Sequence, residues 1–168
     1  MPDPDRPVAL LFDWGDTLMR DDPTQSGPMA QWPEVAALPG AHEALAWARG
    51  IGQVGIASGA ADSGSADIRA ALARVGLDGL IDFIFCRREI GADKTDPRFW
   101  QAILAQLGLP ARQVVMIGDS YTADIAPAQA AGLHTFWLNS RNLPPRPTTA
   151  TIHALSELPQ RFPCDLVK

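Results

Sequence analysis

Four polar residues follow short apolar runs in this sequence, and their types could together do chemistry. Asp13 directly follows the first run and Ser58 the second, Asp119 follows the fourth after Gly118, and Lys94 lies one loop beyond the third. Asp13 and Asp119 would repel each other strongly at one site unless a cation lay between them. A hard ion such as Mg²⁺, which binds carboxylates, carbonyls, water and substrate phosphate, would remove this repulsion.

The same residues suit phosphoryl transfer. The Ser58 hydroxyl and the backbone N–H groups at the Gly59 turn can donate hydrogen bonds to phosphate oxygens. Lys94 would supply positive charge against a nucleophile and the phosphoryl oxygens. Positioning and charge neutralisation do most of the catalysis in such reactions, so this set of residue types predicts a phosphoryl-transfer site.

The apolar runs have the length of strands buried on both faces, as in a parallel sheet. Ligands of open α/β sheets bind at the carboxyl ends of the strands, where the four polar residues would converge. The predicted strands are a run ending at Phe12, then 54–57, 83–86, 114–117 and 134–138, with 151–153 as a further strand.

Helical patterns separate these runs. They lie over 41–49, from a cap at Asp62 or Ser63 to Val75, from Asp96-Pro97 to Leu107, from Ser120 to Ala131, and over 156–161. Strands alternating with helices predict a three-layer α/β/α Rossmann-like domain with a parallel sheet of five or six strands. We expect residues 1–168 to form this single domain, without a separate cap domain.

Composition narrows the class of protein. Of 168 residues, 46% are hydrophobic and 20% charged, which is typical of a soluble globular domain. The net charge of −5, without a basic run, argues against nucleic acid as a partner. No apolar stretch approaches the ~20 residues of a membrane span, and the polar, proline-broken start is unlike a signal peptide. Two cysteines without metal spacing favour a reduced, cytoplasmic protein.

The motifs, in this order, resemble those of the haloacid dehalogenase (HAD) superfamily. The resemblance rests on Phe12-Asp13-Trp14-Gly15-Asp16-Thr17-Leu18, on 56–58, on Lys94 within 91–97, and on 117–125. It covers nearly the whole chain at workable spacings. Each motif alone is weak evidence for the family, but four motifs in the same order are strong evidence.

The resemblance implies a nucleophile and a metal site. Asp13 would form an aspartyl-phosphate, as carboxylates can in covalent catalysis. Mg²⁺ would be bound by Asp13, the carbonyl of Gly15 and Asp119, with Asp124 as a further partner of the metal or of the lysine. Ser58 at the Gly59 turn would hold the phosphoryl group, and Lys94 would fix and neutralise it.

Each of these residues also has a purely structural interpretation. Ser58 could belong to a plain turn, Lys94 to a solvated surface, Asp119 to a helix cap, and Asp124 to an exposed helix face. The four motifs together favour the functional interpretation.

One departure from the family pattern concerns the residue after Trp14. HAD phosphatases have a second aspartate two residues after the nucleophile, followed by glycine, and that aspartate is the acid-base residue. Here Gly15 comes first and Asp16 second. Two interpretations of Asp16 stay open: a catalytic acid-base group, or a carboxylate that caps a turn. General acid-base assistance is typically worth roughly 10²–10⁴-fold in rate.

The second departure is the lid that HAD enzymes usually carry. Residues 19–37 are irregular and rich in proline and glycine, so we expect a flap or minimal cap there. An open site excludes water poorly unless a large substrate or a second subunit covers it, which makes a homodimer worth testing.

The sequence thus favours a Mg²⁺-dependent phosphomonoester hydrolase acting on a small-molecule or exposed phosphoester. One alternative is a phosphate- or Mg²⁺-binding protein with weak or no turnover. A dehalogenase or phosphonatase is disfavoured, because the metal-site motif is present and no lysine precedes Lys94. The sequence does not specify which phosphoester is the substrate.

Overall fold

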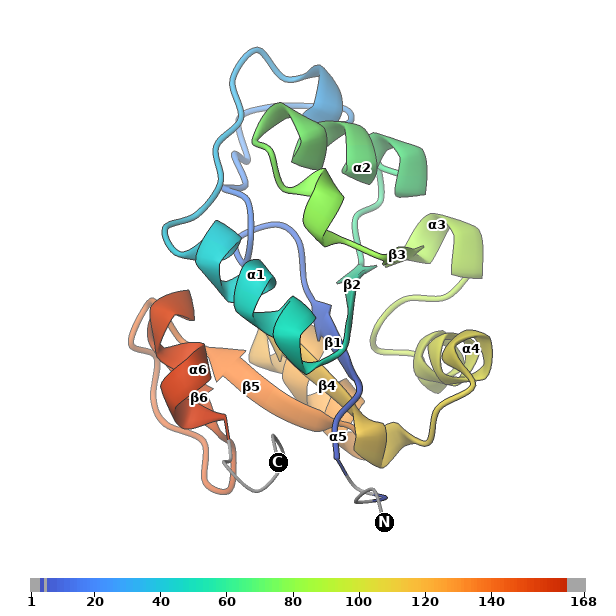
Figure 1. The fold of residues 1–168 in the computed structure, drawn as a ribbon. Coiled ribbons are helices and arrows are strands. Elements are labelled where there is room, and N and C mark those ends of the chain that lie inside the picture. The colour runs from blue at the N-terminus through green and yellow to red at the C-terminus, as the bar shows by residue number, and fades with distance from the viewer. Residues whose placement is uncertain (1–3, 5, 163–168) are drawn as a thin grey trace.

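A six-stranded parallel sheet forms the centre of the molecule, with strand order β3-β2-β1-β4-β5-β6 (Figure 1). The computed structural model describes residue 4 and residues 6–162. This sheet confirms the predicted α/β class and the predicted strands. Their bounds are β1 Ala9–Phe12, β2 Gln53–Ser58, β3 Phe83–Cys86, β4 Val114–Gly118, β5 His134–Leu138 and β6 Thr151–Ile152.

Helices cover both faces of the sheet, which gives the predicted three layers (Figure 1). Alternate residues of β1 face opposite sides, since side chains of a strand alternate. Leu10 and Phe12 pack in the cluster with α1, α2 and α6, whereas Ala9 and Leu11 pack in the cluster with α4 and α5. The α-helices are α1 Ala41–Ile51, α2 Ser65–Arg74, α3 Arg87–Ile90, α4 Pro97–Leu107, α5 Ala126–Ala130 and α6 Leu158–Arg161.

Short helical turns complete the chain. A π-helical turn, η4, precedes α5, so the helix predicted from Ser120 to Ala131 is not uniform. Ser120 caps this turn, as its hydroxyl accepts a hydrogen bond from the N–H of Ala123 at 3.2 Å. The 3₁₀ turns are η1 Met29–Gln31, η2 Asp78–Leu80, η3 Ala111–Gln113 and η5 Leu155–Glu157, and η4 spans Tyr121–Ile125.

The predicted cap of α2 is wrong. The helix begins at Ser65 with Gly64 as its N-cap, rather than with Asp62 or Ser63. Two carboxylates take the N–H groups at this helix start: Asp67, within the first turn of α2, accepts from Gly64 at 2.9 Å, and Glu89, from α3, accepts from Ser65 at 2.9 Å. By contrast, the predicted cap of α4 is confirmed, since Asp96 accepts from the N–H of Arg98 at 2.9 Å.

Residues 19–37, called the flap below, contain η1 and otherwise no helix. Trp32 and Met29 of the flap are buried, and the Trp32 indole donates to the carbonyl of Gly27 at 3.1 Å. Arg74 of α2 donates to three flap carbonyls, among them that of Trp32 at 2.6 Å. The flap is therefore irregular in backbone but tied to the body of the domain.

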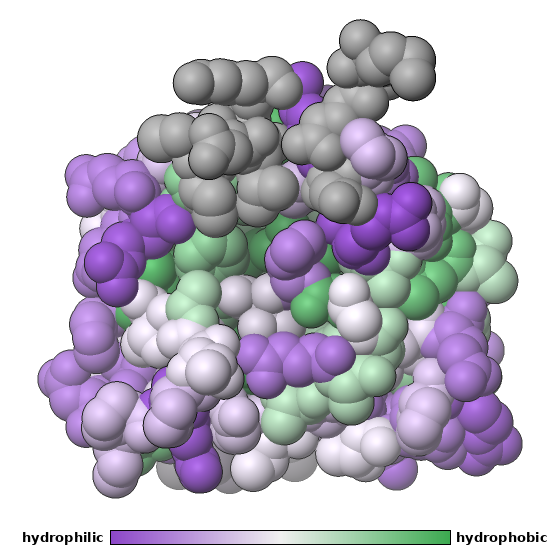
Figure 2. Space-filling model, turned by 90° about the horizontal axis from the view of Figure 1, so that it is seen from below, coloured by the Kyte–Doolittle hydropathy of each residue, from purple (hydrophilic) through white to green (hydrophobic). Residues whose placement is uncertain are grey.

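Exposed large apolar side chains are scarce in the described part. On the face turned downward in Figure 1, hydrophilic residues form much of the outline and hydrophobic residues show in between (Figure 2). Leu143 is the large apolar side chain that stands exposed among the residues described. None of the described helices has both the length and the apolar character that crossing a membrane requires. A homodimer remains a prediction.

Candidate active site

Three neighbouring strands end at one place. Phe12, the last residue of β1, pairs with Ile56 of β2 on one side and with Ile117 of β4 on the other. The N–H of Asp13 then donates to the carbonyl of Ile117 at 2.8 Å, which extends the pairing by one residue. The parallel register thus brings Asp13 beside the end of β4, which leads into Asp119, as the sequence predicts.

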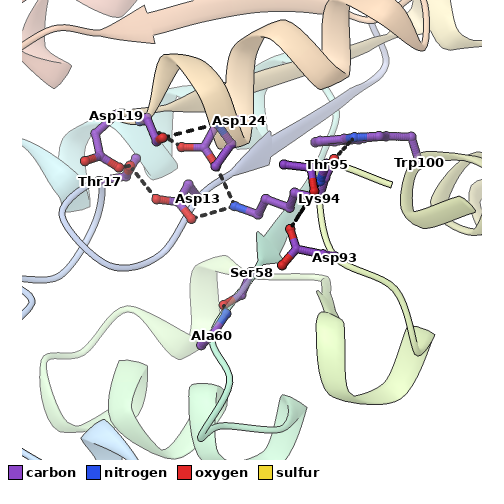
Figure 3. A network of polar contacts seen from close by, with 12 residues as sticks. Asp13, Thr17, Ser58, Ala60, Asp93, Lys94, Thr95, Trp100, Asp119 and Asp124 are labelled. Carbon is purple, nitrogen blue, oxygen red and sulfur yellow. Dashed lines mark hydrogen bonds and ion pairs between the residues drawn. The ribbon is translucent and has the colours of Figure 1, made fainter. Parts of the chain in front are cut away.

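Lys94 links two carboxylates in the interior. Its Nζ lies 2.7 Å from Asp13 Oδ1 and 2.7 Å from Asp124 Oδ1 (Figure 3). The Lys94 side chain is only 3% exposed, and its carbonyl accepts a hydrogen bond from the indole of Trp100 at 2.8 Å. Burial lowers the pKa of Lys94, but the charges of Asp13 and Asp124 outweigh that effect and raise the pKa above its usual value. The lysine therefore stays charged.

Three carboxylates crowd together beside this lysine. Asp13, Asp119 and Asp124 each place an oxygen within 4.8 Å of the others. The Thr17 hydroxyl joins two of them, at 3.0 Å from Asp13 Oδ2 and 3.3 Å from Asp119 Oδ1 (Figure 3). Burial and the charge of Asp13 raise the pKa of Asp119 to about 7. Among the described residues, Lys94 forms ion pairs with two of these carboxylates, Asp13 and Asp124. Such a group of oxygen ligands fits a hard divalent cation.

Asp124 is held on both of its oxygens. Oδ1 accepts from Lys94, and Oδ2 accepts from the N–H of Ser120 at 3.0 Å. Gly118 makes room for this arrangement, because a Cβ at that position would collide with the Asp124 carboxyl group. Burial and the charge of Asp13 raise the pKa of Asp124 to about 6, although Lys94 and the Ser120 N–H act in the opposite direction.

A cavity of about 420 Å³ lies over the Asp13–Lys94 pair. Ser58 is nearly buried at the end of β2, and its Oγ accepts from the N–H of Ala60 at 3.1 Å. The Ser58 hydroxyl proton can therefore be donated elsewhere. The predicted site residues that line this cavity are Asp13, Gly15, Ser58, Gly59, Lys94 and Asp124.

Two predicted residues lie outside this cavity wall. Asp119 lines a neighbouring hollow, where its carbonyl accepts from the indole of Trp137 at 3.0 Å. Asp16 lines a different hollow, beside Leu38, and has a left-handed φ of 59°. Its Oδ1 accepts from the N–H of Asp21 at 3.0 Å. Of the two interpretations left open for Asp16, this contact fits the turn-capping one.

Sequence reasoning missed two side chains at the site. Thr17 belongs to the first motif, but no spacing rule indicates that it connects Asp13 to Asp119. Asp21 lines the cavity from the flap. Partial burial and the charge of Asp16, then those of Asp22 and Asp13, raise the pKa of Asp21. The sequence feature that could have drawn attention to Asp21 is the acidic pair Asp21-Asp22 in an irregular segment.

The fold and the site define a family. The model of haloacid dehalogenase-like hydrolases matches residues 24–132, which include Ser58, Lys94, Asp119 and Asp124 and begin after Asp13. The chain belongs to this family.

Individual relatives differ in their chemistry. The pyrimidine 5′-nucleotidase YjjG of Escherichia coli is 33% identical over 128 residues, which cover 72% of this chain and 56% of that protein. This chain thus spans about half the length of that relative. An uncharacterised protein from Listeria monocytogenes serotype 4b has a TM-score of 0.81 and 25% identity, covering 91% of this chain and 95% of its own. The crystal structure of a dehalogenase with an intermediate complex has a TM-score of 0.66 and 28% identity. The match covers 74% of this chain and 56% of the dehalogenase chain.

Proposed function

We propose that this protein is a Mg²⁺-dependent phosphomonoester hydrolase that acts through an aspartyl-phosphate on Asp13. One observation carries the proposal: the Asp13 carboxylate lies in a cavity, held between Lys94 Nζ at 2.7 Å and the Thr17 hydroxyl at 3.0 Å. These contacts fix its direction before a substrate arrives, which is what positioning contributes to catalysis.

The metal would be held by residues at the ends of β1 and β4. Asp13, Asp119 and the carbonyl of Gly15 are its proposed ligands, and Asp124 holds Lys94 beside it. When bound, Mg²⁺ would supply positive charge against phosphoryl oxygens and relieve the crowding of the carboxylates. That crowding, seen in the raised pKa of Asp119, supports this assignment.

The remaining residues would bind and neutralise the phosphoryl group. In the first step an Asp13 oxygen forms a bond to phosphorus while the ester P–O bond breaks, and the leaving oxygen takes the electron pair and a proton from a general acid. In the second step water attacks phosphorus and gives a proton back to that group, the bond between the Asp13 oxygen and phosphorus breaks, and phosphate leaves. Ser58 and the Gly59 turn would hold phosphoryl oxygens, and Lys94 would offset their negative charge.

The proposed substrates are small phosphomonoesters, since the cavity is of small-molecule size. Because the E. coli relative is named a pyrimidine 5′-nucleotidase, pyrimidine nucleotides belong first in a substrate panel. A cytoplasmic location is part of the proposal and is supported by Cys86, which is buried as a free thiol.

A second candidate is a phosphate- or Mg²⁺-binding protein with weak turnover. The specific observation in its favour is that Asp16, the carboxylate nearest in sequence to the family's acid-base position, lines a different hollow. That candidate predicts Mg²⁺ binding with negligible phosphate release across the panel.

The test is phosphate release from an aryl phosphate in the presence of Mg²⁺, with wild type beside Asp13→Asn. We expect release by wild type, near-background release by the variant, and loss of activity on chelation. Equal rates for the two proteins would overturn the nucleophile assignment. Chloride release from a 2-haloacid that persists with chelator present would instead establish a dehalogenase.

A further inference from the structure

Gly15 leaves the site without a carboxylate at the position where HAD phosphatases have their acid-base aspartate. We propose that Asp21, reaching over from the flap, is the acid-base residue of this site. This inference rests on the proposed phosphatase function and names the group that completes it.

The geometry at Gly15 carries the inference. A Cβ built on Gly15 would lie 3.7 Å from Asp21 Cβ, 3.8 Å from Asp21 Cγ and 3.9 Å from Asp21 Oδ2. The Asp21 carboxyl therefore lies within contact distance of the place where a side chain at position 15 would begin. Asp21, Gly15 and Asp13 line the same cavity.

The neighbouring residue positions this carboxylate. Asp16 Oδ1 accepts from the N–H of Asp21 at 3.0 Å, and the backbone N–H of Asp16 donates to the carbonyl of Met19 at 2.7 Å. The next residue, Arg20, donates its N–H to the carbonyl of Ala36 on the returning limb of the flap at 2.9 Å. The inverted Gly15-Asp16 order thus has two structural consequences. Gly15 leaves space beside Asp13, and the Asp16 side chain holds the backbone of Asp21 through a hydrogen bond.

Exposure of Asp21 suits contact with a leaving group. Asp21 is exposed at the cavity rim, whereas Lys94 and Asp124 are buried at its floor. A phosphomonoester whose phosphoryl group lies on Asp13 would direct its alcohol portion toward the rim. Asp13 and Asp124 are engaged with Lys94, and Asp93 accepts from the N–H of Thr95 and pairs with Arg87. Of the other two carboxyls that line the cavity, Asp21 and Asp62, Asp21 is the one beside Gly15, so we assign the proton exchange with the alcohol oxygen to it.

The proposed proton transfers balance over one cycle. As the Asp13 oxygen bonds to phosphorus and the ester P–O bond breaks, the Asp21 carboxylic acid gives its proton to the leaving oxygen, releasing an alcohol. The Asp21 carboxylate then takes a proton from water as the water oxygen attacks phosphorus. The Asp13–phosphorus bond breaks, phosphate leaves, and both aspartates return to their starting forms.

The test compares Asp21→Asn on two substrates that differ in their need for a proton. For a simple alkyl phosphate, whose leaving group is poor, kcat/KM should fall by about 10²–10⁴-fold. For 4-nitrophenyl phosphate, whose leaving group needs no proton, kcat/KM should change far less. Because the second step also slows, this variant should release nitrophenol in a burst, with the phosphoryl group accumulating on Asp13.

The matched control is Asp22→Asn. It makes the same change of charge one residue away, and the Asp22 carboxyl contacts Thr24 within the flap rather than the cavity. We expect it to retain wild-type kinetics on both substrates. Equal losses for both substrates in Asp21→Asn, without a burst, would overturn the inference and indicate a structural role. Absence of Asp13-dependent turnover in wild type would instead refute the proposed phosphatase function.

A rescue experiment guards against misfolding of the single variant. Position 15 accepts a side chain, since Gly15 is not in the left-handed region and its Cβ would make ordinary contacts. Adding Gly15→Asp to Asp21→Asn should restore alkyl phosphate hydrolysis, whereas adding Gly15→Asn should not. If the two double variants, Gly15→Asp with Asp21→Asn and Gly15→Asn with Asp21→Asn, hydrolyse the alkyl phosphate at the same rate, the inference fails.

Discussion

The site has two parts that are built in different ways. One part, around the ends of β1 and β4, holds Asp13, Asp119, Asp124 and Lys94 through buried and partly buried contacts between 2.7 and 3.3 Å. The other part, the turn after Asp13 and the flap, has an irregular backbone, and its carboxylates Asp16 and Asp21 are exposed.

The difference lies in what fixes each side chain. Strand register fixes the first part, because Phe12 pairs with both neighbouring strands and leaves Asp13 at their common edge. In the second part a few hydrogen bonds within a turn decide where Asp16 and Asp21 lie. We infer that the strand ends provide the nucleophile and charge neutralisation, whereas the turn and flap provide proton transfer.

Replacement of Lys94 should have the largest effect, because it breaks the strand-end part. Lys94→Met would leave two carboxylates, Asp13 and Asp124, buried without their cation. Removing one partner of a buried pair costs about 3–5 kcal/mol in the free energy of unfolding. Phosphatase activity should fall by at least about 10²–10³-fold. Chemical denaturation and phosphate release measure the two effects.

An exposed ion pair offers the matched control for this variant. Arg98 contacts Asp96 at 2.6 Å, but its side chain is 74% exposed. Arg98→Met should change the free energy of unfolding far less than Lys94→Met does, because solvent screens an exposed pair, and it should leave activity intact. Similar losses of stability in the two variants would mean that burial does not distinguish the strand-end part.

The pH dependence of stability should test the strand-end part next. In the metal-free protein the pKa of Asp119 is raised to about 7 in the folded state. A carboxyl with a raised pKa stabilises the fold fully below its unfolded value of about 4, and this contribution is lost as pH rises toward 7. The melting temperature of the metal-free protein should therefore fall by a few degrees over that interval.

Metal and mutation provide the controls for the pH experiment. Mg²⁺ should raise the melting temperature more at neutral than at acidic pH, since it offsets carboxylate repulsion. Asp119→Asn should flatten the pH dependence. A pH dependence that is unchanged in Asp119→Asn and unaffected by Mg²⁺ would contradict the assignment of Asp119 to the metal site.

Substitution of Asp16 should have the smallest effect. Asp16→Asn keeps an oxygen that can accept from the N–H of Asp21, so we expect kcat/KM within about threefold of wild type. Asp16→Ala loses this acceptor, worth about 0.5–1.5 kcal/mol, and should lower activity more. Steady-state kinetics on an alkyl phosphate check both. A loss in Asp16→Asn as large as that in Asp21→Asn would make Asp16 itself the acid-base group.

The sequence predicts the strand-end part well for a physical reason. Parallel strands bring their carboxyl ends to one edge, so Asp13, Ser58 and Asp119 can be placed without coordinates. The strands and the cap of α4 are confirmed because each depends on local pattern. The cap of α2 is wrong because Glu89, distant in sequence, binds the N–H of Ser65.

The turn and flap could not be predicted in the same way. The left-handed φ of Asp16 directs its side chain away from the cavity, and the sequence alone does not indicate that conformation. Asp21 comes close to Gly15 because of the path of an irregular segment. That segment has no helical or strand periodicity from which its path could be predicted. The contact between Thr17 and Asp119 spans 102 residues and follows from the tertiary fold.

The central claim is that Asp13 becomes phosphorylated during turnover. The direct measurement is acid quench of wild type with 4-nitrophenyl phosphate and Mg²⁺, followed by peptide mass analysis, beside Asp13→Asn and Asp21→Asn. We predict one phosphoryl group on Asp13 in wild type, a larger amount in Asp21→Asn, and none in Asp13→Asn. Turnover without any phosphoryl group on Asp13, or with one on another residue, would contradict the account.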